Sequence, residues 1–314
     1  MNTRRAGLWA MGGQTLLAGI GYSFARTASQ EFDPFVLTLL RMSVTASLFG
    51  ITFFLRGGFG QLTANASPLT KAAWMRLAGL AVLGVTLNQF LFLCGMKFTT
   101  PANSALIYAI TPLFVLIIAV FILRSERLTL QKGIGIAVAL AGVSVVLFAR
   151  GNKFDAELML GNILILGAVC CWASYISLGK KVIGKFDTIQ ATALLMMLGA
   201  VIYAPVGLWR LFTSPWHAVS VSAWIGFWYI TLLSSAASYL LLTFAMSRLE
   251  SSQVSVFMNA QPVVAAAFSA AVYGEVLSLN LILGGLVAIT GIYVMTRPSS
   301  SVAVAANPRT TTGN

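Results

Sequence analysis

The chain is divided into ten long apolar segments, and this division limits its fold more than any other feature. A helix needs about 20 mostly apolar residues to cross a bilayer. Segments near that length lie at residues 7–28, 34–55, 74–94, 101–123, 132–149, 159–178, 188–209, 223–246, 251–273 and 278–296. Inside a bilayer, backbone groups find partners only in helices or closed barrels. The pattern therefore predicts an all-α membrane protein with ten transmembrane helices.

Composition agrees that lipid is the solvent of this chain. Hydrophobic residues make up 58% of the 314 residues and charged residues only 9%, whereas about 25% of the residues in a soluble domain are charged. The net charge of +12 comes from Lys and Arg that lie mostly between the apolar segments. We interpret this charge as a membrane-topology signal and expect no nucleic-acid partner.

The same basic residues predict an orientation. With the N-terminus inside, thirteen Lys and Arg lie in inner segments, and four lie in outer loops: Lys97, Arg150, Lys153 and Arg210. This bias places both termini in the cytoplasm of a multi-pass protein of an inner or plasma membrane. Residues 297–314 are rich in Ser, Thr and Ala, so we expect a disordered cytoplasmic tail there.

A faint internal repeat divides the chain into two halves, residues 7–149 and 159–296. The matching positions include Asp33 with Asp187, Pro112 with Pro262, and Glu126 with Glu275. Their offsets are 154, 150 and 149 residues. Because each half has an odd number of predicted helices, the second half must enter the membrane from the opposite side, which makes the repeat an inverted one. Two such halves are typical of secondary transporters, whose site lies where the halves meet.

Several motifs within these halves are similar to those of a known family. They are Gly95 to Ile107 (GMKFTTPANSALI), Thr111-Pro112, Ser125 to Leu128 (SERL), Gln261-Pro262 and Gly274-Glu275. Together they resemble the EamA repeat of the drug/metabolite transporter superfamily, over about residues 7–296. The resemblance implies ten helices, cytoplasmic termini and a central cavity between the halves. It also implies the export of small metabolites.

The paired prolines mark the centre of each half. Pro112 and Pro262 each fall at the middle of a predicted helix, where proline deprives the carbonyl four residues earlier of its donor. A water-filled cavity or a substrate could satisfy these carbonyls of Tyr108 and Met258. A packing kink satisfied by a neighbouring helix is the alternative. We expect hinge or gating roles for the prolines, and helix capping or the locking of one conformation for Glu126 and Glu275.

Polar and aromatic residues gather around these prolines. The candidate substrate-binding residues are Asn88, Asn103, Tyr108, Thr111, Trp172, Tyr175, Tyr239, Met258, Asn259 and Gln261. The amides and hydroxyls either bond neighbouring helices or line a polar passage, because an unpaired amide is costly in hydrocarbon. The deep aromatic residues either pack or form a cavity wall for apolar or aromatic solutes.

Arg41 is the clearest single exception to the apolar pattern. It lies seven residues into the segment 34–55, which is about 10 Å at 1.5 Å per residue. Its side chain either extends to the outer membrane face or faces the cavity. In the cavity it would bind a carboxylate or a phosphate.

The residues needed for most other chemistry are missing from the apolar segments. All eight Asp and Glu fall in predicted loops or at helix ends, which disfavours proton coupling through a carboxylate at the midplane. The single histidine, His217, falls in a loop, and no P-loop is present. We therefore expect no cofactor, no metal and no enzymatic activity.

These observations predict a secondary transporter that exports amino acids or similar small metabolites by alternating access. Its partners are a small-molecule substrate and the lipid bilayer, and its oligomeric state stays open. A nucleotide-sugar or organophosphate exchanger is the alternative, although it would need several cavity Lys or Arg. An intramembrane enzyme and a non-transporting scaffold are further alternatives.

Overall fold

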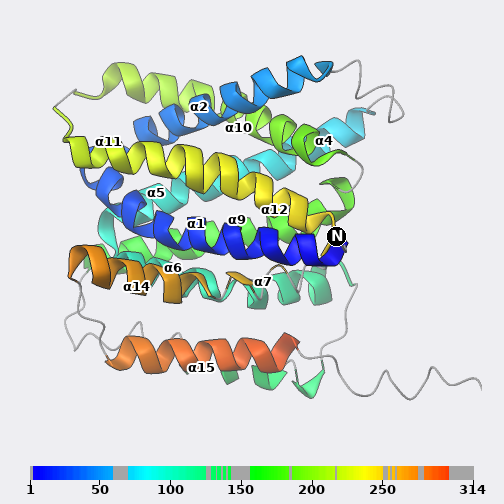
Figure 1. Cartoon of the computed structure of the whole chain (residues 1–314), viewed down its shortest axis with the longest axis vertical. Helices are drawn as coiled ribbons and strands as arrows, with labels where there is room; N and C mark the ends of the chain where they lie inside the picture. The colour runs from blue at the N-terminus through cyan, green and yellow to red at the C-terminus, as the bar shows by residue number, and fades with distance from the viewer. Residues whose placement is uncertain are drawn as a thin grey trace, which may run out of the picture.

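Every regular element in the computed structural model is a helix, among the residues that the structure describes. These are 3–58, 70–124, 156–183, 186–215, 218–249, 260–274 and 279–296, with a few positions between 129 and 142 and at 254, 257 and 258. The helices are α1 (Thr3–Glu31), α2 (Pro34–Leu55), α4 (Lys71–Ala81), α5 (Asn88–Phe98), α6 (Pro101–Ala109), α7 (Thr111–Ile117), α9 (Ala156–Ile183), α10 (Thr188–Thr213), α11 (Val221–Trp228), α12 (Ser238–Met246), α14 (Gln261–Tyr273) and α15 (Leu279–Thr296). Three π-helical segments continue helices: η1 (Val82–Leu87), η2 (Ile118–Ile122) and η3 (Tyr229–Ala237). The helices run side by side across the molecule (Figure 1).

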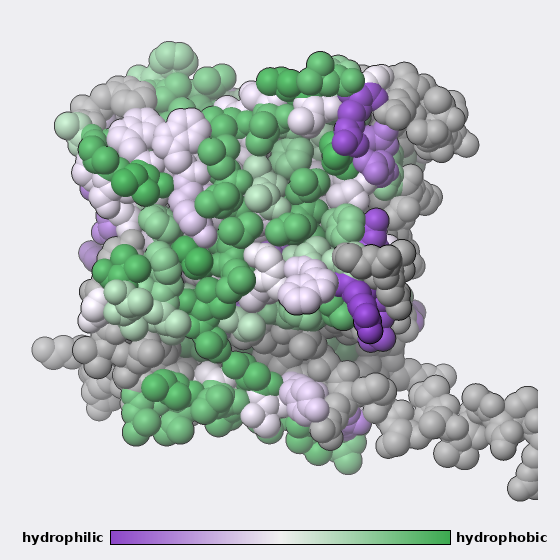
Figure 2. Space-filling model, viewed as in Figure 1, coloured by the Kyte–Doolittle hydropathy of each residue, from purple (hydrophilic) through white to green (hydrophobic). Residues whose placement is uncertain are grey.

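Six helical stretches are long and apolar enough to cross a membrane. They are Pro34–Leu55, Lys71–Phe98, Asn103–Ile122, Glu157–Gly179, Thr188–Thr213 and Val221–Met246. The predicted all-α membrane architecture is thereby confirmed, and the helices α1, α14 and α15 fit the predicted count of ten. The predicted segment 132–149 lies largely outside the described residues. Apolar side chains cover much of the surface, as a lipid-facing protein requires (Figure 2).

Helix α1 is long but less apolar than the six spans, and its position explains why. It packs against α11, η3, α12, α14, α5 and α6, so neighbouring helices surround it. Its polar side chains are buried among them, including Gln14, Ser23 and Ser29. Ser23 shares a 2.8 Å hydrogen bond with Ser269 of α14. A helix that faces protein can carry polar side chains that a lipid-facing helix cannot.

Repeat-related aspartates cap the second helix of each half. Asp33 accepts hydrogen bonds from the backbone N–H groups of Phe35 and Val36 and so begins α2. Asp187, 154 residues later, accepts from the N–H of Ile189 and begins α10. These caps lie at opposite ends of the bundle, because α2 and α10 enter it from opposite sides. We name the two ends the Asp33 end, on the left of Figure 1, and the Asp187 end, on the right beside the N-terminus.

Helix contacts occur in pairs that fit a twofold relation between the halves. Helix α1 packs on η3 and α12, and its counterpart α9 packs on η1 and α5. The close approaches are also paired. A Cβ built on Gly84 would lie 2.4 Å from Tyr175, and one built on Gly21 would lie 2.6 Å from the Ser234 hydroxyl. The offset of 150 relates Gly84 to Ser234, and the offset of 154 relates Gly21 to Tyr175. Each of the two helix crossings therefore has a glycine at the equivalent contact, in η1 at one crossing and in α1 at the other.

The paired prolines follow breaks in the helix rather than kinks within one. Helix α6 ends at Ala109 and α7 begins at Thr111, with Ile110 between them at φ −80° and ψ 1°. Ala260, 150 residues later, has φ −82° and ψ −12°, and α14 begins at the next residue. Each proline is therefore the second residue of a new helix, a position that needs no backbone donor.

Candidate functional site

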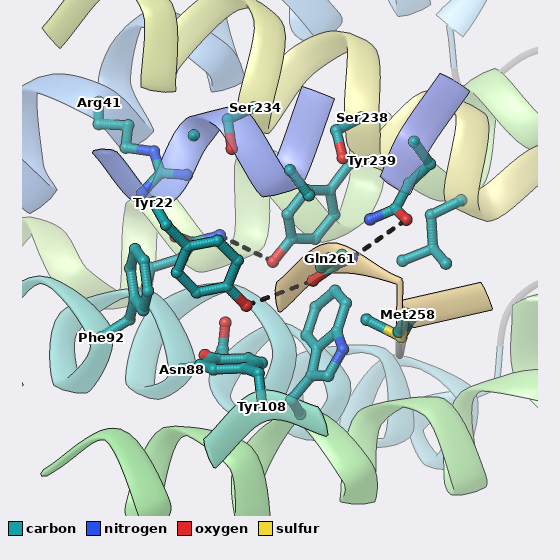
Figure 3. A pocket seen from close by; sticks show the side chains of 16 residues that line it. Tyr22, Arg41, Asn88, Phe92, Tyr108, Ser234, Ser238, Tyr239, Met258 and Gln261 are labelled. Carbon is teal, nitrogen blue, oxygen red and sulfur yellow. Dashed lines mark hydrogen bonds between the residues drawn. The ribbon is translucent and has the colours of Figure 1, made fainter. Parts of the chain in front are cut away.

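A cavity opens at the middle of the bundle, between helices from both halves (Figure 3). Its volume is about 70 Å³, which leaves room for several water molecules at about 10–15 Å³ each. Its lining mixes amides, hydroxyls, aromatic rings and one charge. The lining residues are Gln14, Ala18, Gly21, Tyr22, Arg41, Asn88, Gln89, Phe92, Tyr108, Trp172, Ser234, Ser238, Tyr239, Leu242, Met258 and Gln261.

Arg41 turns inward from α2 and lines this cavity instead of extending to the membrane face. The side chain is only 4% exposed. Its Nε donates a 2.6 Å hydrogen bond to the hydroxyl of Ser235 in η3, whereas Nη1 has no hydrogen-bond partner among the described residues. A buried guanidinium without an acidic partner is costly, because its charge and its remaining N–H donor stay uncompensated.

Amides and phenols fix the opposite walls of the cavity. Asn88 donates from Nδ2 to the hydroxyl of Tyr108 at 2.7 Å and to the carbonyl of Ala168 at 2.9 Å. On another wall, Tyr22 donates to Gln261 Oε1 at 3.2 Å, and Gln261 Nε2 donates to Gln14 at 3.4 Å (Figure 3). These bonds join helices from both halves and hold the polar side chains in place around the cavity.

One hydrogen bond joins two repeat-related positions. Gln89 Nε2 donates to the hydroxyl of Tyr239 at 2.8 Å, and these residues are 150 apart. Residues related by a twofold axis can touch only where they lie close to that axis. Tyr239 in turn donates to the Gly84 carbonyl of η1 at 2.6 Å. This carbonyl lies in a π-helical segment, a feature that frequently occurs at functional sites.

Aromatic rings form much of the remaining wall. Tyr22, Phe92 and Tyr108 contact one another edge to face, with centroids 5.6 to 5.9 Å apart. Trp172 stacks on Tyr175 and meets the edge of Tyr239. These rings give the cavity apolar surfaces beside its polar groups, the combination that small-molecule sites use.

The structure gathers most of the predicted substrate-binding residues at one place. Those that line the cavity are Arg41, Asn88, Tyr108, Trp172, Tyr239, Met258 and Gln261. Asn103, Thr111 and Tyr175 are buried but do not line it. Asn259 lies outside the described residues, as do Glu126 and Glu275.

Thr111 has a local role that the sequence analysis did not foresee. Its hydroxyl donates to the Tyr108 carbonyl at 2.5 Å. That carbonyl is the one for which we expected water or substrate as a partner, because Pro112 offers it no N–H. The neighbouring threonine satisfies it instead, and this leaves the Tyr108 side chain as the part that reaches the cavity.

Sequence reasoning missed other residues of the lining. Tyr22, Phe92, Ser234 and Ser238 line the cavity, but none was a predicted site residue. Serine and aromatic residues occur throughout apolar segments, and the sequence alone does not show which helix face they occupy. Ser234 and Ser238 lie 150 residues after Gly84 and Asn88, and this repeat offset could have identified them from the sequence.

Comparisons with known proteins place the chain in a family. The sequence model of the EamA-like transporter family matches residues 5–148 and again residues 159–297. An uncharacterized transporter of Archaeoglobus fulgidus is 27% identical over 287 residues, covering 90% of this chain and 94% of the relative. A "probable terminal-alkyne amino-acid exporter" of Streptantibioticus cattleyicolor is 26% identical over 262 residues, covering 83% of each chain.

A solved crystal structure shares the fold. It has 19% sequence identity and a TM-score of 0.66, and the match covers 97% of this chain and 99% of that one. The two family matches together span most of the sequence, and multiple apolar helices make the protein an integral multi-pass membrane protein. The chain belongs to the EamA-like transporter family.

Proposed function

We propose that this protein exports small organic solutes, amino acids or similar metabolites, by alternating access. The main support is the buried guanidinium of Arg41, which lines a cavity between the halves. Its Nη1 has no hydrogen-bond partner among the described residues. Amides and hydroxyls beside it offer hydrogen bonds to the rest of a polar solute. The amino-acid exporter of Streptantibioticus cattleyicolor supports this substrate class at the level of a distant relative.

The charge of the cavity lining favours a singly anionic group. Arg41 is the one Lys or Arg among the lining residues, and none of them is Asp or Glu. A nucleotide sugar or an organophosphate brings at least two negative charges and a larger body. One cation in the lining compensates the charge of an amino-acid carboxylate but not the two charges of such a solute.

Alternating access requires two halves that can exchange their roles. The paired helix contacts and the paired breaks at Ile110 and Ala260 support such an exchange. Helix breaks of this kind absorb movement and accompany substrate sites in transporters. The bias of Lys and Arg supports a cytoplasmic Asp187 end and an outer Asp33 end.

Flux into proteoliposomes tests this proposal. Purified protein should accelerate the uptake of at least one radiolabelled amino acid over protein-free liposomes. Arg41→Gln removes the charge and should reduce that uptake about tenfold or more, because charged hydrogen bonds contribute about 1.5–3 kcal/mol. Arg41→Lys keeps the charge but loses the planar fork, and should retain an intermediate rate.

Two outcomes would contradict the proposal. A protein that inserts normally and carries no solute would be a scaffold. Uptake that is unchanged in Arg41→Gln would remove Arg41 from the site and leave the substrate class without its main support. Size-exclusion profiles of the variants show whether each one is folded.

A further inference from the structure

A buried hydrogen bond between the two halves holds the charged group of the cavity. Nε of Arg41, in α2 of the first half, donates to the hydroxyl of Ser235, in η3 of the second half, at 2.6 Å. The two residues are buried, with 4% and 3% of their surface exposed. Arg41 lines the cavity, whereas Ser235 does not. Ser235 therefore acts on the cavity through Arg41.

The equivalent crossing of helices shows that the fold does not need this bond. Helix α2 packs on η3, and its counterpart α10 packs on η1. The offset of 154 relates Arg41 to Leu195, and the offset of 150 relates Ser235 to Val85. Leu195 and Val85 are apolar and buried. One crossing thus packs with apolar side chains at these positions, and burying a guanidinium costs free energy. The polar pair at the other crossing therefore has a reason beyond packing.

The bond determines which edge of the guanidinium a solute can use. A guanidinium offers a carboxylate two edges, either Nε with one terminal nitrogen or the two terminal nitrogens together. Ser235 occupies Nε and so removes the first edge. This is the one side-chain hydrogen bond that Arg41 makes among the described residues, and Nη1 has no partner there. The edge formed by Nη1 and Nη2 is left, on a guanidinium that extends from α2 toward the residues of the cavity (Figure 3).

We infer that Ser235 is a positioning residue, which holds Arg41 so that Nη1 and Nη2 together receive the carboxylate of the solute. The inference rests on the proposed function and deepens it, because it names the binding edge and the residue that sets it. Two parallel N–H···O bonds recognise a carboxylate by its shape as well as its charge. A primary amide has one oxygen and no charge, so the site should prefer an acid to its amide.

Removal of the Ser235 hydroxyl tests this role. The proteinogenic L-amino acids and their primary amides serve as probes, and thermal stabilisation of the purified protein gives the binding constants. In Ser235→Ala the guanidinium is free to rotate. The best-bound acid should therefore bind about five- to tenfold more weakly, with a smaller change for its amide. Ser235→Thr keeps a hydroxyl acceptor and should retain most of the affinity.

A double-mutant cycle separates positioning from a purely structural role. Arg41→Lys keeps the charge but has no planar fork to orient. Ser235→Ala should therefore weaken acid binding much less in the Arg41→Lys background than in the natural protein. Thr231→Val is the matched control, because it deletes another buried hydroxyl of η3, one that donates to the Phe227 carbonyl at 2.6 Å and does not line the cavity. It should leave the preference for acid over amide unchanged.

The outcomes separate this inference from the proposed function. Equal losses for acid and amide in Ser235→Ala would overturn the inference, and so would an undiminished loss in the Arg41→Lys background. Amino-acid flux by the natural protein would still support the proposed function in both cases. If the natural protein binds no acid and carries none, the proposed substrate class fails as well. Should Ser235→Ala not fold, Ser235→Cys keeps the volume, offers only a weak sulfur acceptor and should show the same loss of acid preference.

Discussion

The two ends of the bundle differ at one equivalent helix crossing. At the Asp33 end, α11 lies tightly on α1: Tyr229 stacks on Phe24 with ring centroids 4.3 Å apart, and Gly226 lets α11 approach the α1 backbone. At the Asp187 end, α4 and α9 leave a cleft of about 460 Å³ between them. The residues that line this cleft are Arg76, Gly79, Leu80, Leu83, Leu178 and Val182.

The repeat offsets explain why only one crossing is closed. The cleft residues correspond in order to Gly226, Tyr229, Ile230, Leu233, Phe24 and Ala28. Where the closed crossing has a glycine at the backbone contact, the open one has Arg76. Where the closed crossing has Tyr229 to fill the space, the open one has Gly79. The unequal side chains therefore pack the crossing at the Asp33 end closely and leave a cleft at the crossing of the Asp187 end.

An ion pair shows the same difference. Arg210 lies 3.0 Å from Asp33 and ties the end of α10 to the start of α2. The offset of 154 relates these residues to Arg56 and Asp187, both of which the structure describes. Among the described residues Arg56 and Asp187 form no ion pair, and Asp187 caps α10. The proposed alternating access would reverse this pattern when the Asp33 end opens.

Filling the cleft should have the largest effect. Gly79→Tyr combined with Leu178→Phe copies the Tyr229–Phe24 stack into the Asp187 end. A stacked pair contributes about 0.5–1.5 kcal/mol beyond its buried area, and each 1.4 kcal/mol is about tenfold in population. We expect the double variant to close the Asp187 end and reduce proteoliposome flux about tenfold or more.

A single small substitution provides the control for this variant. Gly79→Ala adds a methyl group where no atom lies within 4 Å, so it should leave flux unchanged. A cysteine at Leu83, in a background without Cys94, Cys170 and Cys171, reports the state of the cleft. Equal reaction of this cysteine with thiol reagents in the natural protein and the double variant would mean that the cleft does not close.

Disrupting the closed crossing should have an effect in the opposite direction. In Gly226→Ala the new Cβ would lie 2.8 Å from the Phe24 carbonyl, so α11 must move away from α1. Overpacking of this kind costs about 1–3 kcal/mol. A cysteine at Ser238 in the cavity should then react faster with an impermeant reagent applied at the Asp33 end.

Gly12→Ala, which meets no atom within 4 Å, is the matched control. A reaction rate unaffected by Gly226→Ala would show that this crossing does not seal the cavity.

Sequence reasoning reached the helices more easily than the contacts between them. The segment 34–55 coincides with α2 because its charge pattern and the Asp33-Pro34 start are local signals. Arg41 and Asn88 stood out because polar residues are rare in apolar segments. Tyr22 and Phe92 did not, since aromatic residues suit lipid and cavity alike. The cleft could not be predicted for another reason. The small size of Gly79 leaves a gap only because α4 lies beside α9, and the sequence does not show that packing.

Removing the ion pair between Arg210 and Asp33 should have the smallest effect, and it allows the two ends to be compared directly. The Arg210 side chain is 37% exposed and that of Asp33 22%, so the pair contributes about 0.2–1 kcal/mol. Arg210→Gln keeps the Asp33 cap of α2 and removes only the pair, and it should raise the reaction rate of the Ser238→Cys reporter from the Asp33 end by a few-fold at most. Arg56→Gln breaks no ion pair among the residues that the structure describes. If Arg56 and Asp187 pair in the alternate state, Arg56→Gln destabilises that state and lowers the same rate. Opposite responses of two arginines 154 residues apart would link both ends to one equilibrium. A rate that Arg210→Gln raises and Arg56→Gln leaves unchanged would mean that the ends open independently.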